Sequence, residues 1–271
     1  MDDRAAAAPL PNPALGFLRK MAAIADLEVR KLRHDPTELA SRAVQPLLWL
    51  VIFGPVMSHG HVIDTGTLPY LDYIVPGILA QSVLFIAIFN GISVIWERDL
   101  GIVHKFLVSP TPRAALVLGK ALGGGVRALV QAIVVVVVGT AIGVRLRLDP
   151  LTLAAVVFFV ILGAAVFSSF SLLIACIVKT RERFMGLGQV LTMPLFFASN
   201  AIYPTSLMPA WLQVVAHVNP LTYEIDALRV LLLPANGQLA HFGLWTDSAV
   251  LCVALALMVS VAARLYPRIA I

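Results

Sequence analysis

Six stretches of this chain are apolar over a length that suits a lipid bilayer. They lie at residues 43–57, 71–95, 122–144, 151–178, 185–202 and 244–263. A bilayer core takes roughly 20 residues of helix, so the first and fifth stretches are short. Lipid offers no partner for unpaired backbone groups, and the strict alternation of a barrel strand is missing, so each stretch is predicted to be a helix. The predicted fold class is therefore all-α, a polytopic membrane protein with six transmembrane helices.

The composition supports a lipid-embedded chain, and the charges predict its orientation. Hydrophobic residues make up 59% of the 271 residues and charged residues 13%, with a mean hydropathy of +0.90, beyond what a soluble core needs. Lys and Arg gather before the first stretch, after the second, after the fourth and at the C-terminus. By the positive-inside bias, we expect both termini in the cytoplasm. The formal charge of +5 is then a topology signal, and nucleic acid is not an expected partner.

Residues 1–38 are expected to form a cytoplasmic N-terminus that carries one amphipathic helix. Leu18, Met21 and Ala25 recur at helical spacing among charged residues, and Pro36 breaks the pattern. This helix is predicted to lie in the cytoplasmic membrane interface. Two roles stay open for it: an anchor that fixes orientation through anionic lipid headgroups, and a lever that touches the partner that drives transport.

A polar segment, residues 96–113, separates the second and third apolar stretches and reads WERDLGIVHKFLVSPTPR. Asp99 stands where a helix N-terminus favours negative charge, and Pro110 stops the helix. Leu100, Val103 and Leu107 share one face of that helix. Apolar residues kept beside charges on a surface indicate a partner. The segment is therefore predicted to be a cytoplasmic docking helix rather than a plain linker.

Two short apolar helices are predicted within residues 203–240, after the fifth stretch. Pro209 starts the first, and Asn219-Pro220 supplies an N-cap with Pro at the first position of the second. Each is too short to span, so we expect an external re-entrant helical hairpin between spans five and six. Its polar groups either satisfy one another or form an external gate or substrate contact.

Polar and aromatic side chains within the spans and the hairpin are candidates for a substrate path or gate. The candidates are Gln81, Asn90, Arg127, Phe196, Asn200, Tyr223 and Glu224. Arg127 is the sharpest case, because a charge deep in a span is costly and usually faces a partner or cavity. Ser, Asn and Gln in lipid more often hold helices together. The small-residue patterns Gly119-x-x-x-Gly123 and Gly186-x-Gly188 suit close packing, and both are candidates for a homodimer seam.

The sequence carries no catalytic, cofactor-binding or metal-binding pattern. His59-x-His61 is the only close histidine pair and has no further ligand nearby beyond Asp64. No G-x-x-x-x-G-K-[ST] is present to cradle phosphate. We therefore expect a transport subunit rather than an enzyme, with no bound cofactor. A secondary transporter is the less favoured class, because midplane ionisable residues and inverted repeats are not evident.

The order of motifs resembles one family over essentially the whole chain. The loop ERDLGIVHKFLVSPTPRAALVLGKAL resembles the cytoplasmic signature of type-two ABC exporter permeases. The segments NAIYP and NPLTY are similar to the C-terminal region of the daunorubicin-resistance type of drug-efflux permease. The resemblance implies a homodimeric permease that receives two copies of a separate ABC ATPase subunit, which binds ATP and Mg. It assigns a coupling helix, resting in a cleft of the ATPase, to Glu97, Asp99, Gly101, Lys105, Phe106 and Leu107.

The same resemblance implies a function in multidrug export and antibiotic resistance. The cargo would be a lipophilic drug, antibiotic or lipid-like substrate, moved out through a bacterial inner (cytoplasmic) membrane. The alternative is a permease for polysaccharide or lipid-linked cell-envelope export, which shares the fold and the ATPase partner. One departure from the family is that Arg-Glu-x-Gly-Thr is replaced by Glu97-Arg98-Asp99-Leu100-Gly101.

Overall fold

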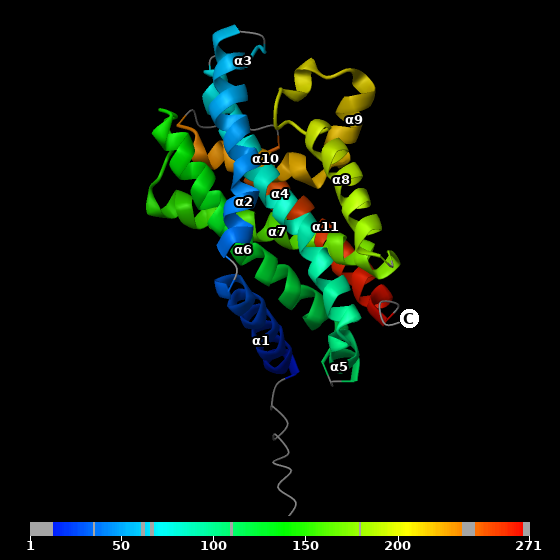
Figure 1. The fold of residues 1–271 in the computed structure, drawn as a ribbon. Coiled ribbons are helices and arrows are strands. Elements are labelled where there is room, and N and C mark those ends of the chain that lie inside the picture. The colour runs from blue at the N-terminus through cyan, green and yellow to red at the C-terminus, as the bar shows by residue number, and fades with distance from the viewer. Residues whose placement is uncertain are drawn as a thin grey trace, which may run out of the picture.

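The computed structural model describes residues 13–34, 36–60, 63–65, 68–108, 111–178, 180–234 and 242–267. Within these ranges every regular element is a helix, so the all-α prediction is confirmed. Figure 1 shows long helices packed side by side, with α1 (Pro13–His34) and α5 (Ile102–Val108) at one end. The opposite end holds α3 (Gly54–Gly60) and α9 (Ala210–Val218). We call these the α5 end and the α9 end.

Five helices of the described chain are long and apolar enough to cross a membrane. The first is the run Ser41–Gly60, formed by α2 (Pro36–Leu48), a π-helical turn (Trp49–Phe53) and α3; the others are α4 (Tyr70–Asp99), α6 (Arg113–Ala141), α7 (Pro150–Ile177) and α11 (Leu244–Leu265). Helix α8 (Arg181–Phe197) covers most of the fifth predicted stretch but has only 17 residues, short of the roughly 20 that a bilayer core takes. The six-span count therefore stays a prediction.

Short polar side chains fix where several helices begin. Asp149 precedes α7 and accepts the backbone N–H of Thr152 at 3.0 Å, which together with the Thr152 hydroxyl holds the pKa of Asp149 below its ordinary value. Asn219 caps α10 (Pro220–Leu232) as predicted, because its side-chain oxygen accepts the Leu221 N–H at 3.0 Å. The Asn219 amide nitrogen also donates to the Leu195 carbonyl at 2.7 Å and thereby ties α10 to the end of α8.

Helix α4 lies at the centre of the bundle and packs on α6, α7, α8 and α10. Glycine permits its closest approaches. A Cβ at Gly77 would collide with the backbone of Ala201, and one at Gly91 would collide with Ser171 on α7. At this second crossing the Gly91 N–H donates to the Ser171 hydroxyl at 3.0 Å. The position of α4 is thus set by backbone contact with its neighbours.

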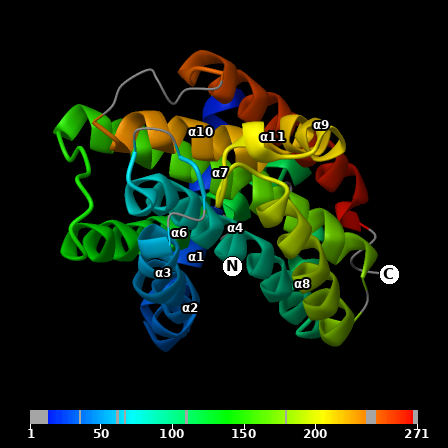
Figure 2. The same cartoon turned by 90° about the horizontal axis from the view of Figure 1, so that it is seen from above.

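The two helices of the predicted hairpin differ in their surroundings. Figure 2 shows α10 running across the bundle, and it packs on α4, α7 and α11 with almost its whole length buried. Helix α9 instead leaves Trp211, Val214 and Val218 exposed, and a short 3-10 turn, Thr205–Leu207, precedes it. Both helices begin at the predicted prolines or one residue later. Whether the pair is re-entrant stays a prediction.

Helix α1 packs along α6, and its predicted place in the membrane interface stays a prediction. A Cβ at Gly119 would lie 2.8 Å from the Met21 carbonyl oxygen, and one at Gly123 would collide with the side chain of Glu28. The small-residue face at Gly119 and Gly123 is therefore covered by α1 of the same chain. The prediction of a homodimer seam at Gly119 and Gly123 is thereby corrected. The space around Gly186, the other candidate for the seam, is open.

Candidate functional site

The predicted coupling segment folds as the end of α4, a tight turn and α5. Helix α4 continues to Asp99, and Gly101 makes the turn with φ of 71°, a left-handed conformation that residues with a Cβ rarely adopt. Helix α5 then begins at Ile102. Asp99 is therefore the last residue of α4. The prediction that it lies at the N-terminus of the coupling helix was wrong, because the helix of the second span continues without a break through Glu97.

Helix α5 is attached to the bundle along one face and exposed along the other. Val103 is fully buried. Phe106 is half-buried, and its ring centroid lies 5.7 Å from the ammonium of Lys120, a buried residue of α6. Lys105 is exposed, and Val108 is 88% exposed. The side chain of Leu107 lies outside the described part of the chain. The helix thus presents a free surface at the α5 end of the molecule (Figure 1).

A cluster of four buried ionic side chains lies directly behind α5. Lys120 of α6 binds Glu97 of α4 at 2.5 Å and Glu28 of α1 at 3.5 Å. The other carboxylate oxygen of Glu28 lies 3.3 Å from the guanidinium of Arg127, which also donates to the Asn90 side-chain oxygen. All four charged residues are less than 10% exposed. We call these four residues the ion cluster.

The ion cluster couples three helices at the point where α5 is attached. Breaking one partner out of a buried ion pair leaves an uncompensated charge, which costs several kcal/mol. A displacement of the end of α4 relative to α1 or α6 is therefore penalised. The sequence interpretation singled out Glu97 and Arg127 but missed Glu28 and Lys120. The helical spacing places Glu28 on the same face of α1 as Met21. This spacing was the feature of the sequence that could have identified Glu28.

A second contact joins the end of α4 to the start of α8. The Arg181 guanidinium binds Asp99 at 2.7 Å and stacks 3.4 Å from the ring centroid of Trp96. Asp99 is also bound by Arg98 at 2.9 Å. The turn before α5 is thus connected to α8 as well as to α1 and α6.

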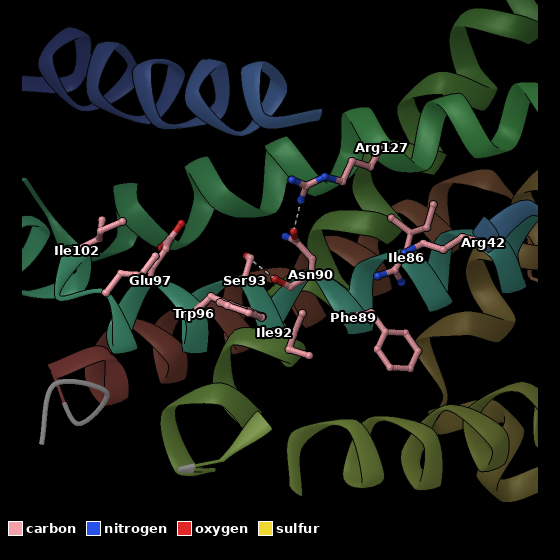
Figure 3. A pocket seen from close by; sticks show the side chains of 11 residues that line it. Arg42, Ile86, Phe89, Asn90, Ile92, Ser93, Trp96, Glu97, Ile102 and Arg127 are labelled. Atoms are coloured by element: carbon pink, nitrogen blue, oxygen red, sulfur yellow. Dashed lines mark hydrogen bonds between the residues drawn. The ribbon is translucent and has the colours of Figure 1, made fainter. Parts of the chain in front are cut away.

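Two adjoining cavities open beside α4 next to the ion cluster. The larger, about 340 Å³, is lined by residues that include Arg42 of α2, Phe89 and Asn90 of α4, and Arg127 of α6 (Figure 3). The smaller, about 180 Å³, shares Arg42 and Phe89 with it and is also lined by Gln81. The first volume lies within the range of small-molecule sites. The structure therefore brings three predicted path residues, Gln81, Asn90 and Arg127, to one pair of cavities.

Comparison with known proteins identifies the family. The profile described as ABC-2 type transporter matches residues 19–233, most of the chain and all of the helices from α2 to α10. The chain belongs to the ABC-2 type transporter family. It is a multi-pass transport permease.

Individual relatives of the permease carry names that concern drug resistance and transport. The daunorubicin resistance ABC transporter permease protein DrrB1 of Streptomyces coeruleorubidus is 28% identical over 83% of this chain and 77% of its own. The probable multidrug ABC transporter permease YbhR of Escherichia coli is 30% identical over 65% and 49% of the two chains. The inner membrane transport permease YadH of Escherichia coli is 27% identical over 70% and 73%.

Two other candidate path residues lie inside the permease core. Phe196 at the end of α8 is fully buried, with its ring centroid 5.8 Å from that of Trp49. The backbone carbonyl of Asn200 accepts from the Arg229 guanidinium at 2.8 Å. The side-chain amide of Asn200 is buried and has no hydrogen-bond partner among the described residues. Neither residue lines the two cavities beside α4.

The last two candidates lie on α10 of the permease. The Tyr223 hydroxyl donates to the His217 carbonyl at 2.7 Å and so closes the α9–α10 turn. Glu224 is buried against Gly163 of α7, and its carboxylate oxygens have no hydrogen-bond partner within the described ranges. Burial raises the pKa of Glu224 well above its ordinary value. The structure thus separates Phe196, Asn200 and the α10 pair from the cavities at Gln81 and Arg127.

Proposed function

We propose that this chain is the permease subunit of an ATP-driven ABC exporter in the inner membrane of a bacterium. Two copies form the membrane unit, and each receives a separate ATPase subunit that holds ATP and Mg. Its cargo is a lipophilic drug, antibiotic or lipid-like molecule. Membership of the ABC-2 family supports this role. The names of DrrB1 and YadH support drug export and an inner-membrane location.

The observation that carries the proposal is the construction of α5. It is a seven-residue helix with an exposed side, at the end of the molecule that also carries α1. Val103 buries its other side, and the Gly101 turn joins it to α4. A short helix with one free face, fixed to a transmembrane helix, suits docking to a partner that pushes on it.

The contacts around α5 suggest how a push would spread. ATP binding closes the ATPase pair and displaces α5 together with the end of α4. Glu97 carries the displacement through Lys120 to α6 and through Glu28 to α1, and Asp99 carries it through Arg181 to α8. The cavities beside α4 then change between inward-open and outward-open forms, by a shift between two states of unequal energy.

Charge placed on α5 tests the docking surface. We expect Lys105→Asp and Val108→Asp, both on the exposed side of α5, to abolish co-purification of the permease with its candidate ATPase, because a carboxylate buried at the contact is costly. Val218→Asp is the matched control, since Val218 is 77% exposed on α9 at the opposite end. Size-exclusion chromatography of each variant checks that it stays folded and of unchanged oligomeric state.

The two outcomes lead to different conclusions. Loss of the ATPase from both α5 variants, with retention by Val218→Asp, supports the coupling helix. Full retention by both α5 variants, with undiminished stimulation of ATP hydrolysis, places the partner contact elsewhere and removes the basis for an ATP-coupled role of α5.

A further inference from the structure

The first span is built from three pieces that differ in their backbone hydrogen bonding. Helix α2 ends at Leu48, the π-helical turn occupies Trp49–Phe53, and α3 begins at Gly54. The Gly54 N–H donates to the carbonyl of Trp49, five residues back, whereas an α-helix bonds to the fourth residue back. Single π-helical turns within helices are rare and frequently lie at functional sites. We call Trp49–Phe53 the π turn.

Proline explains why the helix changes at this point. Pro55 follows Gly54, and in a regular α-helix its ring would clash with the carbonyl of Val51, four residues earlier. Because proline has no N–H, Pro55 also donates no hydrogen bond to the preceding turn. Pro46, inside α2, removes a second such donor. The span therefore bends more easily between these two prolines than a regular helix does.

The upper part of the span is fixed to its neighbours. Helix α3 packs on α4, and Gly54 permits the close approach, since a Cβ there would lie 2.8 Å from the Leu71 side chain. Within the π turn, Leu50 is fully buried. The ring centroid of Trp49 lies 5.8 Å from that of Phe196 at the end of α8. The π turn and α3 are thus held by α4 and α8.

The lower part of the span, α2, is attached more loosely. Figure 2 shows it at the edge of the bundle. The smaller of the cavities beside α4, about 180 Å³, lies between α2 and α4 and is lined by Gln45 and Pro46 on one side and by Gln81 and Phe85 on the other. In the most apolar window of the first span 22% of the residues are buried, against 78% for α4. Close-packed side chains resist displacement, so α2 can move at less cost than α3.

Helix α1 connects α2 to the α5 end of the molecule. It ends at His34, and α2 begins at Pro36. Glu28 holds α1 on α6 through Lys120, and Lys120 in turn binds Glu97 at the end of α4. A displacement of the ion cluster therefore reaches α2 through the chain itself, while α3 stays on α4.

We propose that the π turn is a hinge about which α2 swings relative to α3, and that this swing opens and closes the two cavities beside α4. The bending is a property of the permease alone, whereas its place in a transport cycle rests on the proposed export function. Val44 lies about 10 Å along a helix from Val51, at the centre of the π turn. A change of about 20° at the turn therefore moves Val44 by about 4 Å.

Distances between spin labels test the hinge without an ATPase. Both native cysteines are replaced by serine, and labels are attached at Val157→Cys on α7 and at either Val44→Cys on α2 or Val56→Cys on α3. Val44 and Val56 are matched in exposure, at 53% and 59%. Dilution with unlabelled permease makes distances within one chain dominate. We expect a broader distribution from position 44 than from position 56, and equal widths overturn the hinge.

Two proline variants test where the flexible point lies. Pro55→Ala supplies an N–H that can bond to the preceding turn, so we expect it to narrow the distance distribution between positions 44 and 157. Pro46→Ala is the matched control, because it supplies a donor in α2 outside the π turn, and it should leave the distribution unchanged. Narrowing by Pro46→Ala, or no narrowing by Pro55→Ala, overturns the placement of the hinge at the π turn.

The permease–ATPase complex separates bending from gating. On binding ATP, the mean distance between positions 44 and 157 should shift by about 4 Å, while that between positions 56 and 157 stays the same. An unchanged distance from position 44, in a complex that binds and hydrolyses ATP, overturns the gating role. Failure of the complex to form contradicts the proposed export function instead, and the measurements on the permease alone still decide whether the π turn bends.

Discussion

Replacing Glu28 with alanine is expected to lower the free energy of unfolding by about 3 kcal/mol. Glu28 is 1% exposed on α1. Its carboxylate oxygens lie 3.5 Å from the Lys120 ammonium and 3.3 Å from the Arg127 guanidinium. Alanine at this position leaves two buried cations without their shared anion.

The size of this loss in the free energy of unfolding depends on the partners that Lys120 and Arg127 keep. Removing one member of a buried pair costs about 3–5 kcal/mol. Lys120 keeps Glu97 at 2.5 Å, and Arg127 keeps the side-chain oxygen of Asn90, so the loss belongs at the lower end of that range. A double replacement, Glu28→Ala with Lys120→Ala, should cost less than the sum of the two single losses, because each removes the partner of the other.

The matched control is two residues away on the same helix. Asp26 pairs with Arg30 at 2.8 Å, and the two side chains are 58% and 72% exposed. A surface pair of this kind contributes at most about 1 kcal/mol. Asp26→Ala removes the same number of carboxylates from α1 as Glu28→Ala. The two variants therefore change the charge of α1 equally and differ in whether the lost carboxylate was buried.

Unfolding of purified permease in mixed micelles with increasing SDS, followed by circular dichroism, gives the free energies. Hydrogen exchange measured over α1 and α7 shows where the loss acts. We expect Glu28→Ala to be clearly less stable than Asp26→Ala and to expose the amides of α1 first. Equal midpoints for the two variants, or full additivity in the double replacement, would refute the coupling of α1 to α6 through the ion cluster.

Three further predictions follow from other contacts. Gly123→Val should detach α1 by colliding with Glu28, seen as faster hydrogen exchange in α1 with α7 unchanged. Arg181→Ala should change the free energy of unfolding by no more than about 1 kcal/mol, because its pair with Asp99 is about a third exposed. It should nevertheless reduce the stimulation of ATP hydrolysis, and full stimulation would contradict a role in transmission to α8. For Asp149, hydrogen bonds from Thr152 lower the pKa in the folded protein. Its contribution to stability is therefore present above the unfolded carboxyl pKa of about 3.9 and lost as the pH falls through the folded value. The gap between the SDS midpoints of wild type and Asp149→Ala should close in acid, and a gap that stays constant with pH would contradict the cap.

Much of the secondary structure could be predicted because its causes are local. Apolar length fixes which segments lie in lipid, and backbone hydrogen bonding then requires them to be helical. Caps act within a few residues, which is why Asn219-Pro220 marked the start of α10 correctly. Asp99 was misplaced at a helix start, because nothing within the loop shows that α4 continues as far as this residue.

The partners of polar side chains could not be predicted, because they come from distant parts of the chain. Glu28 and Lys120 are 92 positions apart and meet only once α1 lies on α6. The small face at Gly119 and Gly123 suited a second copy of the chain as well as it suited α1, and only the packing decided between them. The candidate path residues show the same division. The sequence identified Gln81 and Glu224 as polar groups in apolar surroundings, but tertiary structure alone placed Gln81 at a cavity beside α4 and buried Glu224 against a neighbouring helix.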